Sequence, residues 1–184
     1  MNTDLMFSEN LTPLDGEHDT PQAFYDKLDK EFHFDLDPCC TTKSKKAPNG
    51  FCYDLKQDGL VESWDGHKCA FMNPPYGRKY TMDWVKKAWQ ESSRYIRVVG
   101  LLSARTDTKW FHEYVWDTYL GFPHRLIEIR FVKGRLTFGS DEYWKWMWDE
   151  KIIHGKKNSL YQQYGKKNAA GFPSVVIVWH PRHP

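Results

Sequence analysis

The chain has 184 residues, which is about the length of one domain and excludes a large multidomain enzyme. Its four cysteines form no Cys-x-x-Cys pair, so a zinc ribbon is excluded, reduced thiols are expected and no metal site is predicted. No apolar run approaches the roughly 18 residues that a membrane span needs, and the start lacks the pattern of a signal peptide. We therefore expect a soluble, cytoplasmic protein that contacts no membrane.

Charge and aromatic content are the unusual features of the composition. Residues 1–42 hold ten acidic and two basic side chains, whereas residues 43–184 hold 24 basic and 14 acidic ones. A basic body is typical of proteins that bind polyanions, although solvated basic faces also occur without a nucleic-acid partner. Aromatic residues make up 16% of the chain, which fits either a large core or stacking on flat ligands such as bases.

The first elements in chain order are an arm, a helix and a strand. Residues 1–19 lack apolar periodicity and are expected to form a mobile arm before one domain over 20–184. Thr20-Pro21 has the residue types of an N-cap and a first turn, and apolar side chains at four-residue spacing predict a helix that continues to Phe32. The alternating run over 32–38 predicts a strand whose C-terminal end carries Asp35 or Asp37.

The remaining elements alternate between strands and helices. They are a polar loop over 41–50, a buried strand over 69–72, a helix over 80–94, a buried strand over 95–104, a helix over 106–119, a hairpin of 126–132 with 135–138 around Lys133-Gly134, and a closing strand over 174–181. This alternation predicts an α/β fold. We expect a mostly parallel sheet with helices on both faces and an antiparallel hairpin near the C-terminus.

The sharpest motif is Asn73-Pro74-Pro75-Tyr76, which follows the predicted strand over 69–72. In open parallel sheets, ligands bind at the carboxyl ends of strands. The two prolines stiffen the turn, and the Asn73 amide oxygen and the Pro74 carbonyl offer two acceptors for the hydrogens of an exocyclic amine. Tyr76 offers a flat face on which a base can stack. The alternative interpretation is a proline-rich turn in which Tyr76 packs as an ordinary aromatic.

The chemistry of an aromatic amine explains why two acceptors would be useful. Its lone pair is delocalised into the ring, so the nitrogen is a poor nucleophile. Acceptors that draw the two hydrogens out of the ring plane favour the pyramidal, nucleophilic form. With a sulfonium methyl donor held in line, orientation supplies most of what the reaction requires, and no strong general base is expected.

Several blocks in a fixed order resemble those of a known family. They are Thr20-Pro21, FDLDPC, AFMNPPYG, the W-x-x-K-A segment from Trp84 to Ala88, VVGLLSA, GRLTF at 134–138 and FPSVVIVW at 172–179. The chain resembles the phage-type DNA N6-adenine methyltransferases, short members of the class I S-adenosylmethionine-dependent methyltransferases. The resemblance implies a Rossmann-like sheet of reduced size. It also implies that the protein transfers a methyl group from S-adenosylmethionine to N6 of a flipped adenine in double-stranded DNA.

The resemblance also implies a set of residues that bind the cofactor. Thr20 and Pro21 resemble the threonine-proline start near its methionine end, and Asp37-Pro38 resembles the aspartate-proline of the first cofactor strand. Asp37 would attract the positive charge of the cofactor; the alternative is a carboxylate that caps a loop. Asp54 and Asp58 compete as the partner of the ribose hydroxyls, with ordinary loop acidity as the alternative. The glycine-rich turn usual after the first strand is replaced by CCTTKSKKAPNG.

The segment over 139–171 is predicted to be an insertion that contacts DNA. Residues 151–170 hold five lysines and no acidic side chain, and such lysines would neutralise phosphates. The alternative is a solvated loop whose tryptophans close the core. The predicted DNA-binding residues are Arg135, Lys151, Lys156, Lys157, Lys166 and Lys167.

Three other functions remain open at this stage. An RNA adenine methyltransferase would have the same pocket, and a protein glutamine methyltransferase also acts on a planar amide nitrogen. A noncatalytic nucleic-acid-binding module would explain the aromatic and basic residues, but it would not need Asn73-Pro74-Pro75-Tyr76 at the end of a strand. The short chain leaves little room for a separate recognition domain, which allows a homodimer that supplies contacts in trans.

Overall fold

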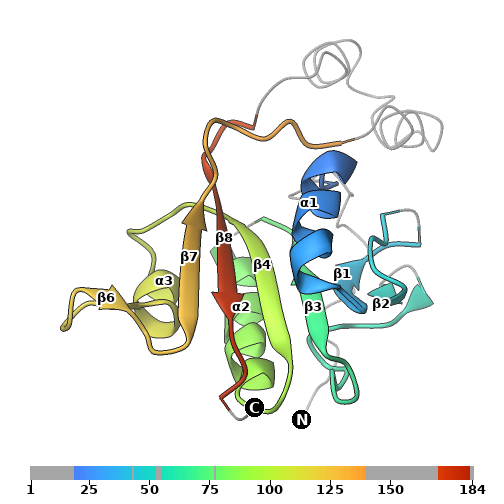
Figure 1. The fold of residues 1–184 in the computed structure, drawn as a ribbon, viewed down its shortest axis with the longest axis horizontal. Helices are drawn as coiled ribbons and strands as arrows, with labels where there is room; N and C mark the ends of the chain where they lie inside the picture. The colour runs from blue at the N-terminus through green and yellow to red at the C-terminus, as the bar shows by residue number, and fades with distance from the viewer. Residues whose placement is uncertain (1–18, 43, 53–54, 77, 140–169, 183–184) are drawn as a thin grey trace.

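A computed structural model describes residues 19–42, 44–52, 55–76, 78–139 and 170–182 (Figure 1). Its main sheet has the strand order β2-β1-β3-β4-β8-β7. The strands are β1 (Leu36–Cys40), β2 (Asn49–Cys52), β3 (Cys69–Met72), β4 (Arg97–Ser103), β7 (Ile127–Phe131) and β8 (Ser174–Trp179). Within this sheet β8 runs antiparallel to both of its neighbours, and the other strands share one direction. The predicted α/β fold with a mostly parallel sheet is confirmed.

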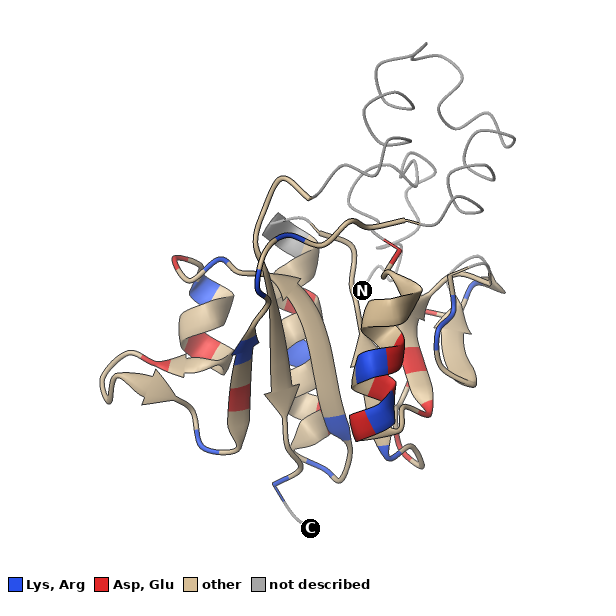
Figure 2. Ribbon diagram, turned by 45° about the horizontal axis from the view of Figure 1, so that its top comes forward, with Lys and Arg blue, Asp and Glu red and all other residues tan. Residues whose placement is uncertain are grey.

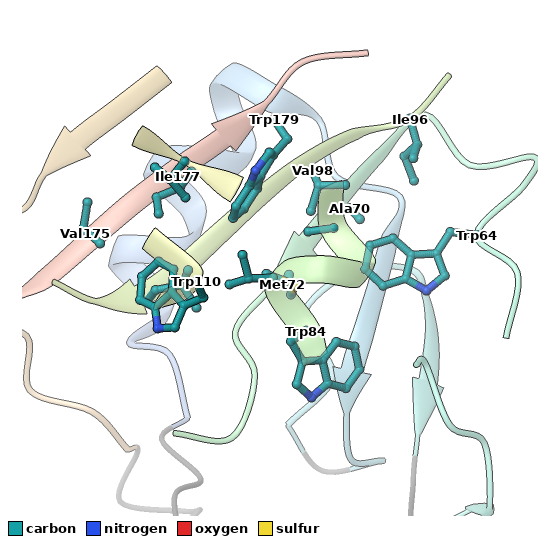
Figure 3. Close-up of a cluster of buried hydrophobic side chains, with 14 of the residues drawn as sticks. Trp64, Ala70, Met72, Trp84, Ile96, Val98, Trp110, Val175, Ile177 and Trp179 are labelled. Carbon is teal, nitrogen blue, oxygen red and sulfur yellow. The ribbon is translucent and has the colours of Figure 1, made fainter. Parts of the chain in front are cut away.

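Helices cover both faces of the sheet, as predicted (Figure 1). Helix α1 (Gln22–Phe32) packs on one face with Phe71 of β3 and Val99 of β4. Helices α2 (Arg78–Ser92) and α3 (Lys109–Tyr114) cover the opposite face, where Figure 3 shows a cluster of buried tryptophan and aliphatic side chains. Strands that are buried on both faces read as continuous apolar runs, which is why VVGLL and VVIVW form the centre of the sheet.

The first two strands differ from the prediction. Strand β1 begins at Leu36, so Asp35 precedes it and Asp37 lies near its start rather than at its C-terminal end. The Asp35 carboxylate accepts hydrogen bonds from the backbone N–H groups of Lys68 and Cys69, which ties it to the beginning of β3. Strand β2 was missed because Asn49 and Gly50, two residues typical of turns, form half of it.

The predicted start of one helix and the predicted end of another also need correction. Thr20 is not the N-cap of α1; Pro21 occupies that position, without a capping hydrogen bond from a side chain. The helix predicted over 106–119 is only α3, and it is followed by a short antiparallel pair, β5 (Trp116–Asp117) and β6 (Phe122–Pro123). The Asp117 carboxylate accepts the backbone N–H groups of Tyr119 and Leu120, a local alternative that competes with helix.

The hairpin predicted around Lys133-Gly134 is wrong. Strand β7 pairs instead with β8, and Gly134 adopts a positive φ of 79° in a turn. Residues 135–138 form no strand and lead away from the sheet edge toward the start of α1, where the Gly139 N–H donates to the Asp19 carbonyl. The apolar alternation of RLTF was misleading because Phe138 is buried beside α1 and Phe71 rather than in a sheet.

The structure also bears on the cysteines and on membrane insertion. All four cysteines are thiols, as predicted, and Cys40, Cys52 and Cys69 are buried. Among the described helices, none has the length and apolar character needed to cross a membrane.

Candidate active site

Asn73 and Tyr76 lie at the carboxyl end of β3, next to the start of α1. The Asn73 Nδ2 donates a hydrogen bond to the Thr20 Oγ1 at 2.9 Å. The Tyr76 hydroxyl donates to the Asn73 Oδ1 at 3.0 Å, and the Leu101 carbonyl on β4 lies 3.3 Å from the same hydroxyl. The structure therefore brings together three residues that the sequence singled out: Thr20, Asn73 and Tyr76.

The side chain of Tyr76 is held by two aromatic neighbours. Its ring lies 5.0 Å from that of Phe172 and 6.0 Å from that of Phe138, both with the planes steeply inclined. Burial raises the pKa of Tyr76 well above its usual value, so the hydroxyl stays protonated and acts as a donor. Sequence reasoning missed both phenylalanines as site residues, although each lies in a block that carried the resemblance.

The two prolines of the motif have different environments. Pro74 is buried, whereas Pro75 is partly exposed. Together the two prolines form a short rigid turn between Asn73 and Tyr76. This turn connects β3 to α2, as the sequence predicts.

Asp37 is a buried carboxylate on β1. Its Oδ2 accepts the Lys46 N–H at 3.0 Å, and its Oδ1 lies 3.4 Å from the Cys39 nitrogen. Burial raises the pKa of Asp37 to about 7, because desolvation outweighs the effect of these backbone donors and of the Lys46 charge. A carboxylate that is costly to ionise in a buried position is suited to receive a cationic ligand.

A second acidic group and a lysine connect Asp37 to Thr20. The Lys46 ammonium lies 3.0 Å from the Asp19 Oδ1 and also donates to the Gln22 Oε1 at 3.2 Å. Burial raises the pKa of Asp19, and the Lys46 charge partly offsets this effect. Asp19 immediately precedes Thr20, so two adjacent residues link Lys46, whose backbone N–H donates to Asp37, to Asn73. The sequence did not single out Asp19 or Lys46.

The other predicted cofactor residues have diverse positions. Pro21 gives its carbonyl to the N–H groups of Phe24 and Tyr25 at the start of α1. Pro38 is buried next to Gly59, at which an added Cβ would come within 1.9 Å of the Pro38 oxygen. This close approach brings the neighbouring Asp58, whose Oδ1 accepts the Leu60 N–H at 2.9 Å, beside the middle of β1. Asp54 lies outside the described residues.

The predicted DNA-contacting insertion begins and ends beside Tyr76. Phe138 and Phe172, which touch Tyr76, stand at its two ends, and the Ala170 N–H donates to the Leu136 carbonyl at 2.8 Å. Arg135 is exposed and donates to the Ala170 carbonyl at 3.1 Å, so it links the two ends. Five predicted DNA-binding residues lie outside the described part of the chain, namely Lys151, Lys156, Lys157, Lys166 and Lys167.

The charges on the described part of the molecule are mixed. Figure 2 shows acidic and basic residues interspersed along α1, the helix that begins at the site. That helix lies in the part of the sequence that is rich in acidic residues, so it does not test the expectation of a basic surface over residues 43–184.

A family model described as DNA N-6-adenine-methyltransferase (Dam) matches residues 8–183, nearly the whole chain. No curated protein matches it.

Proposed function

Because the chain belongs to the DNA N-6-adenine-methyltransferase (Dam) family, we propose that it transfers a methyl group from S-adenosylmethionine to N6 of an adenine that is flipped out of double-stranded DNA. The observation that carries this proposal is the placement of Asn73 and Tyr76 at the carboxyl end of β3, where they are hydrogen-bonded to each other and Asn73 is bonded to Thr20, the residue after Asp19. In this transfer the carbon–sulfur bond would break as the new carbon–nitrogen bond forms, the donor would leave as a neutral thioether, and the methylated amine would then lose one proton to solvent. The enzyme would mainly orient the two reactants.

Asn73 and Pro74 would hold the adenine amine. The Asn73 Oδ1 and the Pro74 carbonyl are acceptors, and an amine that donates one hydrogen to each is drawn toward the pyramidal, nucleophilic form. Pro75 would keep the turn rigid, so the two acceptors stay at a fixed spacing while the base enters.

Tyr76 would exchange its hydrogen-bond acceptor when the base enters. In the structure, its hydroxyl donates to the Asn73 Oδ1, the atom that the amine would use. The hydroxyl has the Leu101 carbonyl as a second acceptor 3.3 Å away, so it can release Asn73 without losing a partner. The ring would then stack on the base.

Buried carboxylates support a cofactor site near Asn73 and Tyr76. The cofactor would supply an electrophilic methyl group on a positively charged sulfur. Asp37 offers negative charge to a cationic ligand, and burial raises its pKa, so a bound cation would favour its ionised form. The nearby Asp19 is already paired with the Lys46 ammonium. Thr20, Pro21 and Pro38 border this region, and Asp58 is the described candidate for the ribose hydroxyls; Asp54 remains a second one.

Double-stranded DNA is the substrate that we propose. In a duplex, the adenine amine is paired and stacked, and residues at the end of β3 can reach it only after the base is flipped. We propose that the insertion over 139–171 contacts the DNA, with Arg135 at its base and the five lysines on phosphates. The two residues that flank this segment, Phe138 and Phe172, contact the Tyr76 ring, which supports the proposal. The predicted homodimer remains an expectation.

The experiment that tests this function measures transfer of a labelled methyl group from S-adenosylmethionine to unmodified duplex DNA, with RNA of the same sequence as competitor. Asn73→Ala and Tyr76→Ala should lower transfer by about 100-fold or more, because orientation and electrostatic contacts carry the rate. Gln90→Ala and Tyr119→Ala, on exposed residues of α2 and of the β5–β6 turn, serve as matched controls. Labelling of RNA in preference to DNA, or full activity of Asn73→Ala, would overturn the proposal.

A further inference from the structure

Thr20 has a buried hydroxyl with an unexpected partner. Its side chain is 2% exposed, and the hydroxyl accepts the hydrogen bond from the Asn73 Nδ2 across 53 positions of sequence. A threonine next to a helix start normally caps the helix with this oxygen. Here Pro21 is the N-cap, and its carbonyl accepts the N–H groups of Phe24 and Tyr25. Thr20 lies one residue before the cap, and its hydroxyl faces Asn73 rather than α1.

The amide of Asn73 has two ends with opposite hydrogen-bonding character. The terminal torsion of asparagine is broad, so contacts rather than the rotamer itself decide which end faces a ligand. An amine can only be held if the Oδ1 faces it, because the Nδ2 is a donor and would oppose the amine hydrogens. With Oδ1 toward the amine, the Nδ2 faces Thr20 and requires an acceptor there.

We infer that Thr20 is a positioning residue that holds the Asn73 amide with its oxygen toward the target amine. A hydroxyl can accept from Nδ2 or donate to Oδ1, so the free protein tolerates either orientation of the amide. Once the target amine is present, it needs the Asn73 Oδ1 as its acceptor. The Asn73 Nδ2 must then donate to the Thr20 hydroxyl, so only this orientation of the amide satisfies the amine, the amide and the hydroxyl together. This inference rests on the proposed function, since it assigns Thr20 a part in the same site.

The backbone on both sides of Thr20 keeps its hydroxyl in place. Before it, the Asp19 carboxylate pairs with Lys46 at 3.0 Å, and the Asp19 carbonyl accepts the Gly139 N–H at 2.8 Å. After it, Pro21 has a fixed φ and begins α1. Thr20 is therefore held at a defined distance from β3, as a positioning contact requires.

This role differs from the cofactor-binding role that the resemblance implies for Thr20, and kinetics can separate the two. Thr20→Val keeps the shape of the side chain and removes the acceptor. We expect it to lower the single-turnover rate of methyl transfer to duplex DNA by about 10- to 100-fold, because a small misplacement of the reacting groups is costly. The dissociation constant for S-adenosylmethionine should stay within twofold, and Thr20→Ser should restore the rate.

The experiment is a double-mutant cycle that combines Thr20→Val with Asn73→Ala. If Thr20 acts through Asn73, the double variant should be no slower than Asn73→Ala alone. Thr20→Ala, measured in parallel, removes the hydroxyl without the branched side chain and covers the case in which valine disturbs folding. Thermal unfolding of each variant checks that the fold is intact.

Each other outcome overturns the inference in a distinguishable way. If the losses in transfer rate from Thr20→Val and Asn73→Ala are additive, or if the dissociation constant for S-adenosylmethionine rises as the rate falls, Thr20 acts on the cofactor instead. Full activity of the folded Thr20 variants alongside an inactive Asn73→Ala would reject the role of Thr20 and leave the proposed function intact. Full activity of Asn73→Ala would reject both.

Discussion

The amide of Asn73 lies between two hydroxyl groups, one from the segment before α1 and one from its own turn. At the residue scale, this small network decides what the site can do. Each hydroxyl can serve as donor or acceptor, so the network can rearrange when an amine arrives, without leaving a buried polar atom unsatisfied. A carboxylate at position 73 would accept at both ends and would not leave a donor for Thr20.

Tyr76→Phe separates the ring from the hydroxyl. The variant retains the surface for stacking and removes the donor that occupies the Asn73 Oδ1 in the free protein. We expect methyl transfer to stay within about threefold of wild type, with an equal or lower KM for DNA, whereas Tyr76→Ala loses about 100-fold because the stacking surface is removed. Steady-state kinetics on duplex DNA measures both. A loss in Tyr76→Phe as large as that in Tyr76→Ala would contradict the stacking role.

Asp37 predicts a pH dependence of cofactor binding. Because burial raises the pKa of Asp37 to about 7, the carboxyl is largely neutral at pH 6 and largely ionised at pH 8. Only the ionised form attracts a cation, so affinity for S-adenosylmethionine should fall by roughly tenfold from pH 8 to pH 6. Calorimetric titrations at several pH values measure the change, and Asp37→Asn should flatten it. The same slope in Asp37→Asn would show that another group titrates.

The same carboxyl predicts the sign of a stability change. The pKa of Asp37 is raised above the value of 3.8 that it has without the fold, so its contribution favours folding below pH 4 and is lost as the pH rises through about 7. Asp37→Asn lacks this ionisation. The difference in melting temperature, variant minus wild type, should therefore increase from pH 5 to pH 8 in the absence of cofactor, and scanning calorimetry measures it. A difference that does not change with pH would indicate that the pKa of Asp37 is not raised in the folded protein.

At the scale of elements, the predictable parts are those with strong apolar patterns. Strands β3, β4 and β8 and the buried side of α2 were found because continuous apolar runs and four-residue spacing leave few alternatives. Strand β2 and the end of α3 were not, because local turn chemistry and tertiary packing compete there. The pairing of β7 with β8 joins segments more than 40 residues apart, and no local pattern encodes it.

Gly100 in the middle of β4 shows how tightly the central strands are packed. A Cβ at this position would lie 2.8 Å from the Trp179 ring and 3.0 Å from the Met72 side chain. Gly100→Ala should lower the free energy of unfolding by about 1–3 kcal/mol through overpacking. Gly171→Ala, where the added Cβ meets nothing within 4 Å, is the matched control. Denaturant unfolding compares them, and equal stability of the two variants would contradict this packing.

At the scale of the whole molecule, three segments distant in sequence meet at one end of the sheet: the start of α1, the turn after β3 and the two ends of the insertion. Sequence alone identified Asn73, Tyr76 and Thr20 from motifs and resemblance. It could not show that Thr20 contacts Asn73, or that Phe138 and Phe172 hold Tyr76. Such contacts depend on how the chain returns to the site, which a pattern of residue types does not record.

If the insertion over 139–171 contacts DNA, its removal should weaken DNA binding without affecting cofactor binding. Replacing residues 140–169 by a short Gly-Ser linker between Gly139 and Ala170 removes the five lysines and leaves Asp37 and Asn73 in place. Affinity for duplex DNA should fall by about 100-fold or more at 100 mM salt if the lysines make the proposed phosphate contacts, and the salt dependence should become shallower. Affinity for S-adenosylmethionine should stay within about threefold. Unchanged DNA binding would contradict the proposed role of the insertion.

The most direct test of the account is to identify the methylated product. Wild-type protein and Asn73→Ala are incubated with duplex DNA and S-adenosylmethionine that carries an isotopically labelled methyl group, and the DNA is digested to nucleosides for mass spectrometry. The account predicts the label in N6-methyl-2′-deoxyadenosine for the wild type and at least a 100-fold smaller amount for Asn73→Ala. Label in a methylated cytosine, or an equal amount of product from Asn73→Ala, would contradict it.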